Sequence, residues 1–129
     1  MTIATLRADG APRISGIECE FAAGQLQFGS MPGARKGADL ARDPRFALHG
    51  PSFHPETGNE SAWPGEAKVA GRALPAGPVR SDDAPDASEG EMFSADLDEV
   101  VVTRLNLEAT KLVVESWTPS RGYRLVERD

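Results

Sequence analysis

Residues 29–45 read GSMPGARKGADLARDPR, and this stretch decides how the chain is organised. It leaves a predicted strand through small residues, carries the adjacent cations Arg35 and Lys36 into a short predicted helix over residues 33–41, and returns to a strand at Arg45. Exposed amides at the start of a helix attract anions, and the two cations add formal charge at the same place. The stretch therefore predicts a phosphate cradle, although the same cations also fit ordinary solvated helix charge.

The composition is that of an ordinary globular protein. The chain has 129 residues, of which 40% are hydrophobic and 26% are charged, which suits a single domain over residues 1–129. The net charge of −6 argues against general binding of nucleic acid or of an anionic membrane. The single cysteine, Cys19, allows no disulfide within the chain, and we expect neither a signal peptide nor a membrane-spanning helix, because the basic and long apolar runs that these require are not seen in the sequence. We expect a cytoplasmic protein without a nucleic-acid or membrane partner.

Alternating residues predict strands on both sides of the central stretch. Asp9-Gly10 lies between two β-prone runs and is typical of a hairpin turn. The run over residues 12–21 is expected to be one strand that places Arg13 and Ser15 on the same face. Other strands are expected over residues 2–7, 25–29, 45–50, 65–74, 97–105 and 111–117, and a short one in the tail.

Three local signals complete the prediction of the fold. Asp43-Pro44-Arg45 is expected to stop the helix and to form a structural ion pair, because the residue before a proline disfavours helical angles. Gly71 marks a bulge or a close approach. Residues 75–91 are expected to form a solvated excursion with a second short helix near residues 84–90. Many short strands with one or two helices favour a small antiparallel β-barrel.

Five segments, in their order along the chain, resemble the FMN-binding split-barrel superfamily, the pyridoxamine 5′-phosphate oxidase-like proteins. The segments cover residues 4–15, 31–36, 39–45, 68–73 and 115–122 and read ATLRADGAPRIS, MPGARK, DLARDPR, KVAGRA and ESWTPSRG. The resemblance implies a mainly β fold, a six-stranded antiparallel split β-barrel with one or two short helices. It further implies a homodimer with two flavin-type cofactors in grooves at the subunit interface. Such proteins bind FMN or the deazaflavin F420, and some bind haem.

Matched by motif, the resemblance implies cofactor-binding roles for Arg13, Ser15, Ser30, Met31, Lys36, Trp117 and Arg121. The first two would lie on the strand that lines the groove. The next two would end the strand whose backbone passes the isoalloxazine ring, and Lys36 would be the phosphate-binding cation. The last two would lie near the C-terminal strand that often reaches the partner's cofactor.

Other interpretations of these residues stay open at this stage. Arg13 and Ser15 also fit a strand face where Arg13 pairs with Glu18 or Asp9, and Trp117 also fits a core or interface anchor. His49 and His54 lack the spacing that would bring them together on a metal, so no metal site is expected. No Ser-His-Asp or Gly-x-Ser-x-Gly arrangement supports hydrolysis.

The resemblance predicts an FMN- or F420-dependent oxidoreductase that transfers a hydride to a small molecule. The cofactor supplies that chemistry, so no catalytic residue is expected from the chain. The resemblance would also place a helix before the first strand, where this sequence begins, and a glycine where it has Ser120. The first of these departures favours an alternative, a non-enzymatic dimeric split barrel that binds a cofactor or haem.

Overall fold

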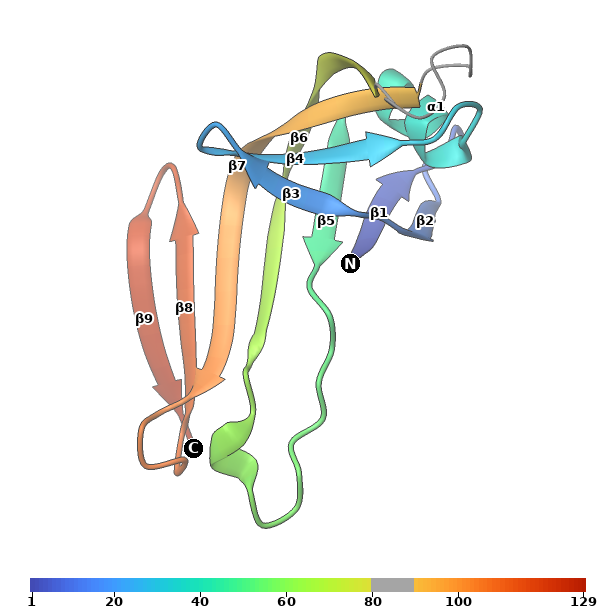
Figure 1. Cartoon of the computed structure of the whole chain (residues 1–129). Coiled ribbons are helices and arrows are strands. Elements are labelled where there is room, and N and C mark those ends of the chain that lie inside the picture. Colours follow the sequence, from blue (N-terminus) through green and yellow to red (C-terminus); the bar gives the residue numbers. More distant parts are fainter. Residues whose placement is uncertain (80–89) are drawn as a thin grey trace.

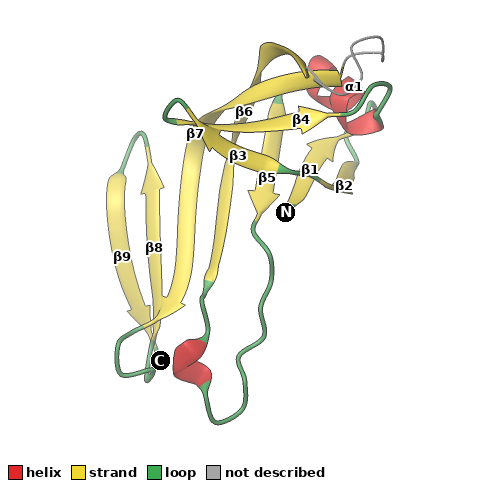
Figure 2. Cartoon of the chain, viewed as in Figure 1, coloured by secondary structure: helices red, strands yellow, loops and turns green. Residues whose placement is uncertain are grey.

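The computed structural model describes residues 1–79 and 90–129, and most of them lie in antiparallel strands (Figures 1 and 2). The strands are β1 (Thr2–Leu6), β2 (Pro12–Gly16), β3 (Cys19–Ala22), β4 (Gln25–Ser30), β5 (Arg45–His49), β6 (Glu66–Val79), β7 (Gly90–Leu105), β8 (Leu112–Thr118) and β9 (Gly122–Arg128). One α-helix, α1 (Arg35–Arg42), and one 3₁₀ turn, η1 (Glu60–Ala62), occur among these residues. The predicted mainly β class is confirmed.

The order of the strands requires the sheet to curl into a barrel. The main path runs β2-β1-β5-β6-β7-β4-β3, so β2 and β3 lie at its opposite ends. Yet these two strands are consecutive in the chain and are joined only by Ile17 and Glu18. Because so short a link reaches only about 10 Å, the two ends of the sheet must come close together. Figure 1 shows β3 and β4 crossing in front of β5 and β6 to close the barrel in this way.

The strands differ from the sequence-based prediction in number and extent. The structure has nine strands in the described residues, of which seven, β1–β7, form the main path of the sheet. The predicted strand over residues 12–21 is divided at Ile17 and Glu18, where the chain crosses from one end of the sheet to the other. β6 and β7 are longer than predicted, and their lower halves continue beyond the barrel with β8 and β9 (Figure 1).

Irregular pairing between β6 and β7 accommodates the glycine and the two prolines within β6. The β6–β7 register shifts between Ala70 and Gly71, so the predicted bulge at Gly71 is confirmed. A Cβ at Gly71 would overlap the backbone carbonyl of Asp96, which reserves this position for glycine. A second register shift lies between Pro75 and Pro78. Proline has no N–H to donate to the ladder, so it is tolerated at an interruption of this kind. The helix predicted near residues 84–90 lies outside the described residues, apart from Gly90, which begins β7.

The barrel interior is filled by a small aromatic and aliphatic core. Phe28 is its centre, with ring centroids 5.1 Å from Phe46 and 5.8 Å from Phe93. The buried cluster consists of Ile3, Ile17, Leu26, Phe28, Leu40, Phe46, Leu48, Ala73 and Phe93. Leu40 is the contribution of α1, and its presence fixes the helix against the end of the barrel.

Helix α1 lies close to the last residue of β4. A Cβ placed on Gly37 would approach the Ser30 hydroxyl oxygen to 2.7 Å, which is closer than real side chains pack. The absence of a side chain at Gly37 therefore lets the helix lie directly on β4. At its other end the helix stops at Asp43, whose carboxylate accepts hydrogen bonds from the Arg45 guanidinium. The predicted helix stop and its ion pair are confirmed.

Truncating the central aromatic residue tests the closed core. We expect Phe28→Ala to lower the free energy of unfolding by about 3–5 kcal/mol, because it removes ring contacts and leaves a cavity. Urea denaturation followed by tryptophan fluorescence measures the change. Phe21→Ala is the matched control, since that ring is exposed and its loss should cost less than about 1 kcal/mol. Equal costs at the two positions would contradict a core centred on Phe28.

Candidate functional site

A buried carboxylate, Asp39, connects α1 to the hairpin of β1 and β2. Its Oδ2 accepts hydrogen bonds from Thr5 Oγ1 at 2.9 Å and from Arg13 Nε at 2.6 Å. Its Oδ1 accepts a bond of 3.0 Å from Arg42 Nη2, which also donates to the backbone carbonyl of Leu6. The Asp39 side chain is only 4% exposed. The four side chains form one polar cluster between the helix and the sheet.

The surroundings of Asp39 keep it ionised. The hydrogen bond from Arg13, supported by those from Arg42 and Thr5, holds the pKa of this carboxyl well below its usual range, although burial alone would raise that pKa. A buried carboxylate with this set of donors is a charged anchor at ordinary pH. It is compensated by two guanidinium groups, so the cluster carries a net positive charge.

The structure confirms that Arg13 and Ser15 share a face, and it identifies the neighbours of that face. In the β1–β2 register Arg13 is opposite Thr5 and Ser15 is opposite the core residue Ile3. Both therefore lie on the side of the sheet that faces the barrel interior and α1.

Arg13 pairs with Asp39, a partner that the sequence did not suggest. Neither Glu18 nor Asp9 pairs with it. Asp9 instead accepts a bond from the amide of Ala11 within the hairpin turn. Apart from the Nε bond, Arg13 has no hydrogen-bond partner in residues 1–79 and 90–129, so its two Nη groups are available.

Lys36 lies beside the same hairpin, one helical turn before Asp39. Its Nζ donates a hydrogen bond of 2.8 Å to the backbone carbonyl of Gly16, at the end of β2. Arg13, Ser15 and Lys36 thus come from β2 and the first turn of α1, which meet at one end of the barrel (Figure 1). An ammonium group with one such bond keeps two further N–H donors.

The start of α1 is electrostatically unusual. Ala34 at the N-cap position makes no side-chain hydrogen bond, and the first turn contains no acidic residue. Arg35 and Lys36 place two positive charges near the positive end of the helix dipole, where anions are favoured. The fold positions this end of the helix close to the cluster around Asp39.

Ser30 and Met31 are placed differently from each other. The Ser30 side chain is buried under α1, where a Cβ on Gly37 would meet it, while Met31 is strongly exposed at the end of β4. Of these two predicted residues only Met31 can face a ligand in this chain, because Ser30, backbone included, is 2% exposed.

Trp117 and Arg121 lie far from these residues in the same chain. They belong to β8 and to the turn before β9, on the opposite side of the molecule from α1 in Figure 1. Trp117 is paired across the strands with Tyr123. The structure therefore does not bring these two predicted site residues together with Arg13 and Lys36 in one chain.

Close to Trp117, a polar triad bridges the strands of the extension. Glu115 accepts hydrogen bonds of 2.7 Å from Tyr123 Oη and of 2.7 Å from Arg104 Nε. The hydrogen bond from Tyr123, together with that from Arg104, lowers the pKa of Glu115, and the same bond raises the pKa of Tyr123. These groups satisfy one another.

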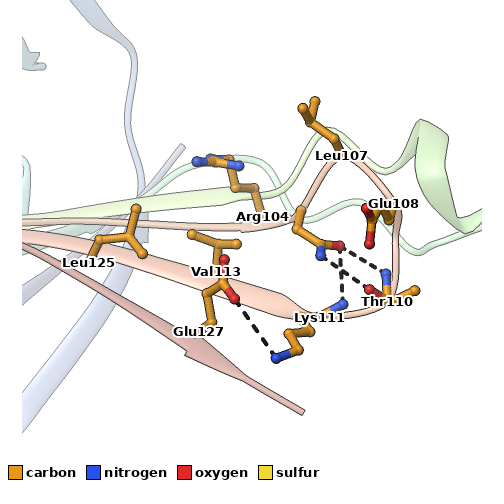
Figure 3. Close-up of a pocket in the computed structure, with 9 residues that line it drawn as sticks. Arg104, Leu107, Glu108, Thr110, Lys111, Val113, Leu125 and Glu127 are labelled. Carbon is orange, nitrogen blue, oxygen red and sulfur yellow. Dashed lines mark hydrogen bonds and ion pairs between the residues drawn. The ribbon is translucent and has the colours of Figure 1, made fainter.

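A surface pocket of about 500 Å³ lies elsewhere, at the end of the β7–β8 hairpin (Figure 3). Its charged and polar lining is already engaged by the protein itself. Lys111 pairs with Glu127 and Asp129, and Asn106 binds the turn residue Thr110. A pocket whose donors are occupied in this way is a weak cofactor site compared with the cluster at Asp39.

The remaining chemistry-bearing residues form no second site in the described parts of the chain. The Nε2 atom of His49 lies 3.5 Å from Oε2 of Glu66, and its Nδ1 is hydrogen-bonded to the backbone carbonyl of Gly50. No group of three or more His, Cys, Asp or Glu residues that could hold a metal ion is found there. Burial raises the pKa of the Cys19 thiol, which lowers the fraction present as the nucleophilic thiolate. No described helix has the length and apolarity needed to span a membrane.

Sequence reasoning missed Asp39 and Thr5 as parts of the site and did not connect Arg42 to them. The hairpin turn at Asp9-Gly10 would have suggested that Thr5 lies opposite Arg13. No comparable signal connects Asp39 to Arg13, because their contact depends on how α1 packs on the sheet.

The lowered pKa of Asp39 predicts a specific acid sensitivity. The pKa falls from about 4 in the unfolded chain to a lower value in the fold, so the stabilisation is complete above pH 4 and is lost as the pH falls below it. We expect the free energy of unfolding to fall below pH 4, and Asp39→Asn to flatten this fall while destabilising the protein near neutral pH. Urea denaturation between pH 2 and 6 measures both.

Asp43→Asn is the control for this acid profile. The pKa of Asp43 is lowered to about 2 by Arg45, but that pair is more exposed and is screened by water. Its removal should alter the profile less. An unchanged acid slope in Asp39→Asn would show that Asp39 does not carry the effect.

Comparison with known proteins identifies the fold. No protein-family model and no curated protein matches the sequence. Among solved structures, PhzG from Burkholderia lata, in complex with tetrahydrophenazine-1-carboxylic acid, has a TM-score of 0.70 at 10% identity, over 99% of this chain and 80% of its own. A pyridoxamine 5′-phosphate oxidase-related, FMN-binding protein from Nostoc punctiforme has a TM-score of 0.67 at 10% identity, over 99% and 85%.

A haem-binding protein from Mycobacterium smegmatis is also similar, with a TM-score of 0.54 at 16% identity, over 98% of this chain and 81% of its own. At such low sequence identities, the structural similarity establishes the fold alone. The three likenesses extend over nearly the whole described chain, including the β6–β9 extension. The chain therefore has the split-barrel fold of the pyridoxamine 5′-phosphate oxidase-like proteins.

Proposed function

We propose that this chain binds a flavin-type cofactor, FMN or F420, and acts as an oxidoreductase that transfers a hydride to a small molecule. One observation carries the proposal. Arg13, Lys36 and the uncapped start of α1 converge at one end of a barrel whose fold is shared with an FMN-binding protein. We assign the phosphate end of the cofactor to this cluster, with Ser15 on the same face.

The donors in this cluster suit a phosphate group. A guanidinium can bind phosphate through two parallel N–H bonds, and an ammonium adds a point charge with several donors. The Nη groups of Arg13 and the remaining N–H groups of Lys36 are of these two kinds. A phosphate near the first turn of α1 would also relieve the unfavourable placement of Arg35 and Lys36 at the positive end of the helix.

When bound, the cofactor would supply the hydride transfer, and the chain would supply binding and orientation. Arg13 and Lys36 would hold the phosphate, while Met31, which is exposed after β4, would border the ring. No general acid or base is required of the chain. The small-molecule substrate is not specified by these residues.

Charge favours FMN over F420 as the occupant. F420 carries a long acidic tail, which would need a wider basic surface than a single phosphate. Of the four cations around α1, Arg42 is committed to Asp39 and Leu6, and Arg45 is committed to Asp43. Arg35 and Lys36 remain, and these with Arg13 match one phosphate.

A homodimer completes the proposed site. Trp117, Tyr123 and Leu125 lie on one face of the β8–β9 extension, as their pairing shows, and are 39%, 62% and 45% exposed. Apolar side chains gathered on one face are typical of an interface. A second copy packed there would cover this face and allow Trp117 and Arg121 to reach the cofactor of the other subunit.

A second candidate is a non-enzymatic dimer that binds haem or a flavin. The likeness to the haem-binding protein favours it. Absorbance spectra distinguish the two candidates, since haem gives an intense band near 400 nm and a flavin gives bands near 370 and 450 nm. Turnover of a panel of small-molecule acceptors by the loaded protein would then favour the enzyme.

The cofactor assignment predicts a binding defect on losing either cation. We expect purified protein to bind FMN in a fluorescence titration, and Arg13→Ala and Lys36→Ala to weaken binding about tenfold or more. A lost hydrogen bond to a charged group costs roughly 1.5–3 kcal/mol, which corresponds to such a factor.

Arg45→Ala is the matched control, because this arginine pairs with Asp43 at the far end of α1 and should leave the affinity unchanged. If the protein binds none of FMN, F420 and haem, the proposed function fails. If Lys36→Ala leaves FMN affinity unchanged while Arg13→Ala weakens it, Lys36 is not part of the site but Arg13 is.

The proposed dimer predicts that a charged residue on the exposed face of β8 and β9 lowers the molar mass measured in solution. We expect a dimer by light scattering at micromolar concentration, and Leu125→Glu to shift it toward monomer because a carboxylate would be buried at the interface. Leu107→Glu is the control, since Leu107 is fully exposed in the β7–β8 turn. A monomeric unmodified protein would contradict the interface.

A further inference from the structure

The Arg13–Asp39 pair uses only one edge of the guanidinium. Asp39 accepts from Nε, at 2.6 Å, and no other residue in the described ranges receives a bond from Arg13. The Nη1–Nη2 edge of the group is therefore left without a protein partner, although the side chain is only 17% exposed. A guanidinium fixed at Nε has little freedom to rotate, so the direction of its open edge is set by Asp39.

The position of Asp39 is fixed by other contacts. Thr5 Oγ1 donates to the same oxygen that binds Arg13, and Arg42 holds the second oxygen while also binding the carbonyl of Leu6. No buried side-chain polar atom among the described residues lacks a partner. The carboxylate is thus held from β1 and from its own helix, independently of Arg13.

Attachment of α1 does not by itself require a carboxylate here. Leu40 already anchors the helix in the core, and Lys36 and Arg42 already bind backbone carbonyls of β2 and β1. A buried ion pair contributes little net stability compared with well-packed apolar residues. The arrangement is better explained by what it does to Arg13.

We propose that Asp39 is a positioning residue, which acts through Arg13 to direct its Nη1–Nη2 edge at a terminal phosphate monoester. This inference rests on the proposed function and names the group that the site recognises. Bidentate binding by a guanidinium depends on its orientation as well as its charge. A phosphate monoester such as that of FMN presents the several oxygens that this edge requires.

The direction in which Asp39→Asn changes phosphate affinity separates positioning from simple electrostatics. Asp39→Asn removes a negative charge next to the site, so attraction of an anion through charge would become stronger. Positioning predicts the opposite, because a neutral amide has one acceptor oxygen in place of two and holds Arg13 Nε less firmly than the carboxylate does. A merely structural role predicts a third result, an equal loss for ligands with and without phosphate.

The test compares FMN with riboflavin, which lacks the phosphate. We expect Asp39→Asn to weaken FMN binding about tenfold or more while riboflavin affinity changes less than about twofold. Asp43→Asn, which makes the same charge change at the other end of α1, should leave FMN affinity unchanged or slightly higher. Unchanged or tighter FMN binding by Asp39→Asn would overturn the inference, and so would a parallel loss of riboflavin.

A double substitution tests whether the effect passes through Arg13. In an Arg13→Lys background, Asp39→Asn should cause no further loss of FMN affinity, since the open guanidinium edge is already gone. A full additional loss would overturn the inference. If Asp39→Asn does not fold, Thr5→Val replaces it, with a loss of about threefold expected for FMN and none for riboflavin; unchanged FMN affinity would then count against positioning.

A readout without a flavin keeps the inference separate from the proposed function. The ¹⁵Nε signal of Arg13 in the unmodified protein should be protected from exchange and should shift on adding millimolar inorganic phosphate. Asp39→Asn should lose both properties. If no cofactor binds but this response is seen, the proposed function fails and the positioning role stands. If phosphate leaves the signal unchanged, or if Asp39→Asn retains the response, the positioning role fails.

Discussion

The ion pair between Asp39 and Arg13 is the interaction on which the candidate site depends. It joins a helix and a hairpin that are distant in sequence, and it does so through a carboxylate almost fully removed from water. Such a group is costly to bury unless every oxygen is satisfied, and here Thr5, Arg13 and Arg42 satisfy both. The strict requirement for partners makes the geometry specific, because a shift of α1 would leave a charge without compensation.

Closure of the barrel places that helix. The link of Ile17 and Glu18 joins the two ends of the sheet, and β4 must then end next to β2, where the chain turns into α1. The Gly37–Ser30 approach brings the helix onto β4, and Leu40 fixes its depth in the core. The cations at the start of α1 therefore reach the end of β2 as a consequence of the same topology that builds the core.

Much of this could be predicted from the sequence, and the physical reasons for the remainder are clear. Local signals sufficed for the Asp9-Gly10 hairpin, the shared face of Arg13 and Ser15, the Asp43 helix stop and the Gly71 bulge, because each depends on neighbouring residues. The break in the run over residues 12–21 was missed, since alternation continues across a bend. The prolines of β6 suggested a loop, yet the ladder accommodates them at an irregularity. The partner of Arg13 was missed because it requires the docked position of α1.

The two groups of site residues suggested by the family resemblance lie in different parts of one chain. Arg13, Ser15 and Lys36 converge because β2 and α1 are packed together by barrel closure, whereas Trp117 and Arg121 lie on the extension formed by β8 and β9 (Figure 1). The aromatic face of this extension is partly exposed. A single chain therefore presents a charged end that suits a phosphate and a separate aromatic face that suits a ring or a protein surface. We propose that two copies associate so that the aromatic face of each lies beside the charged end of the other, which would bring the two groups of residues together.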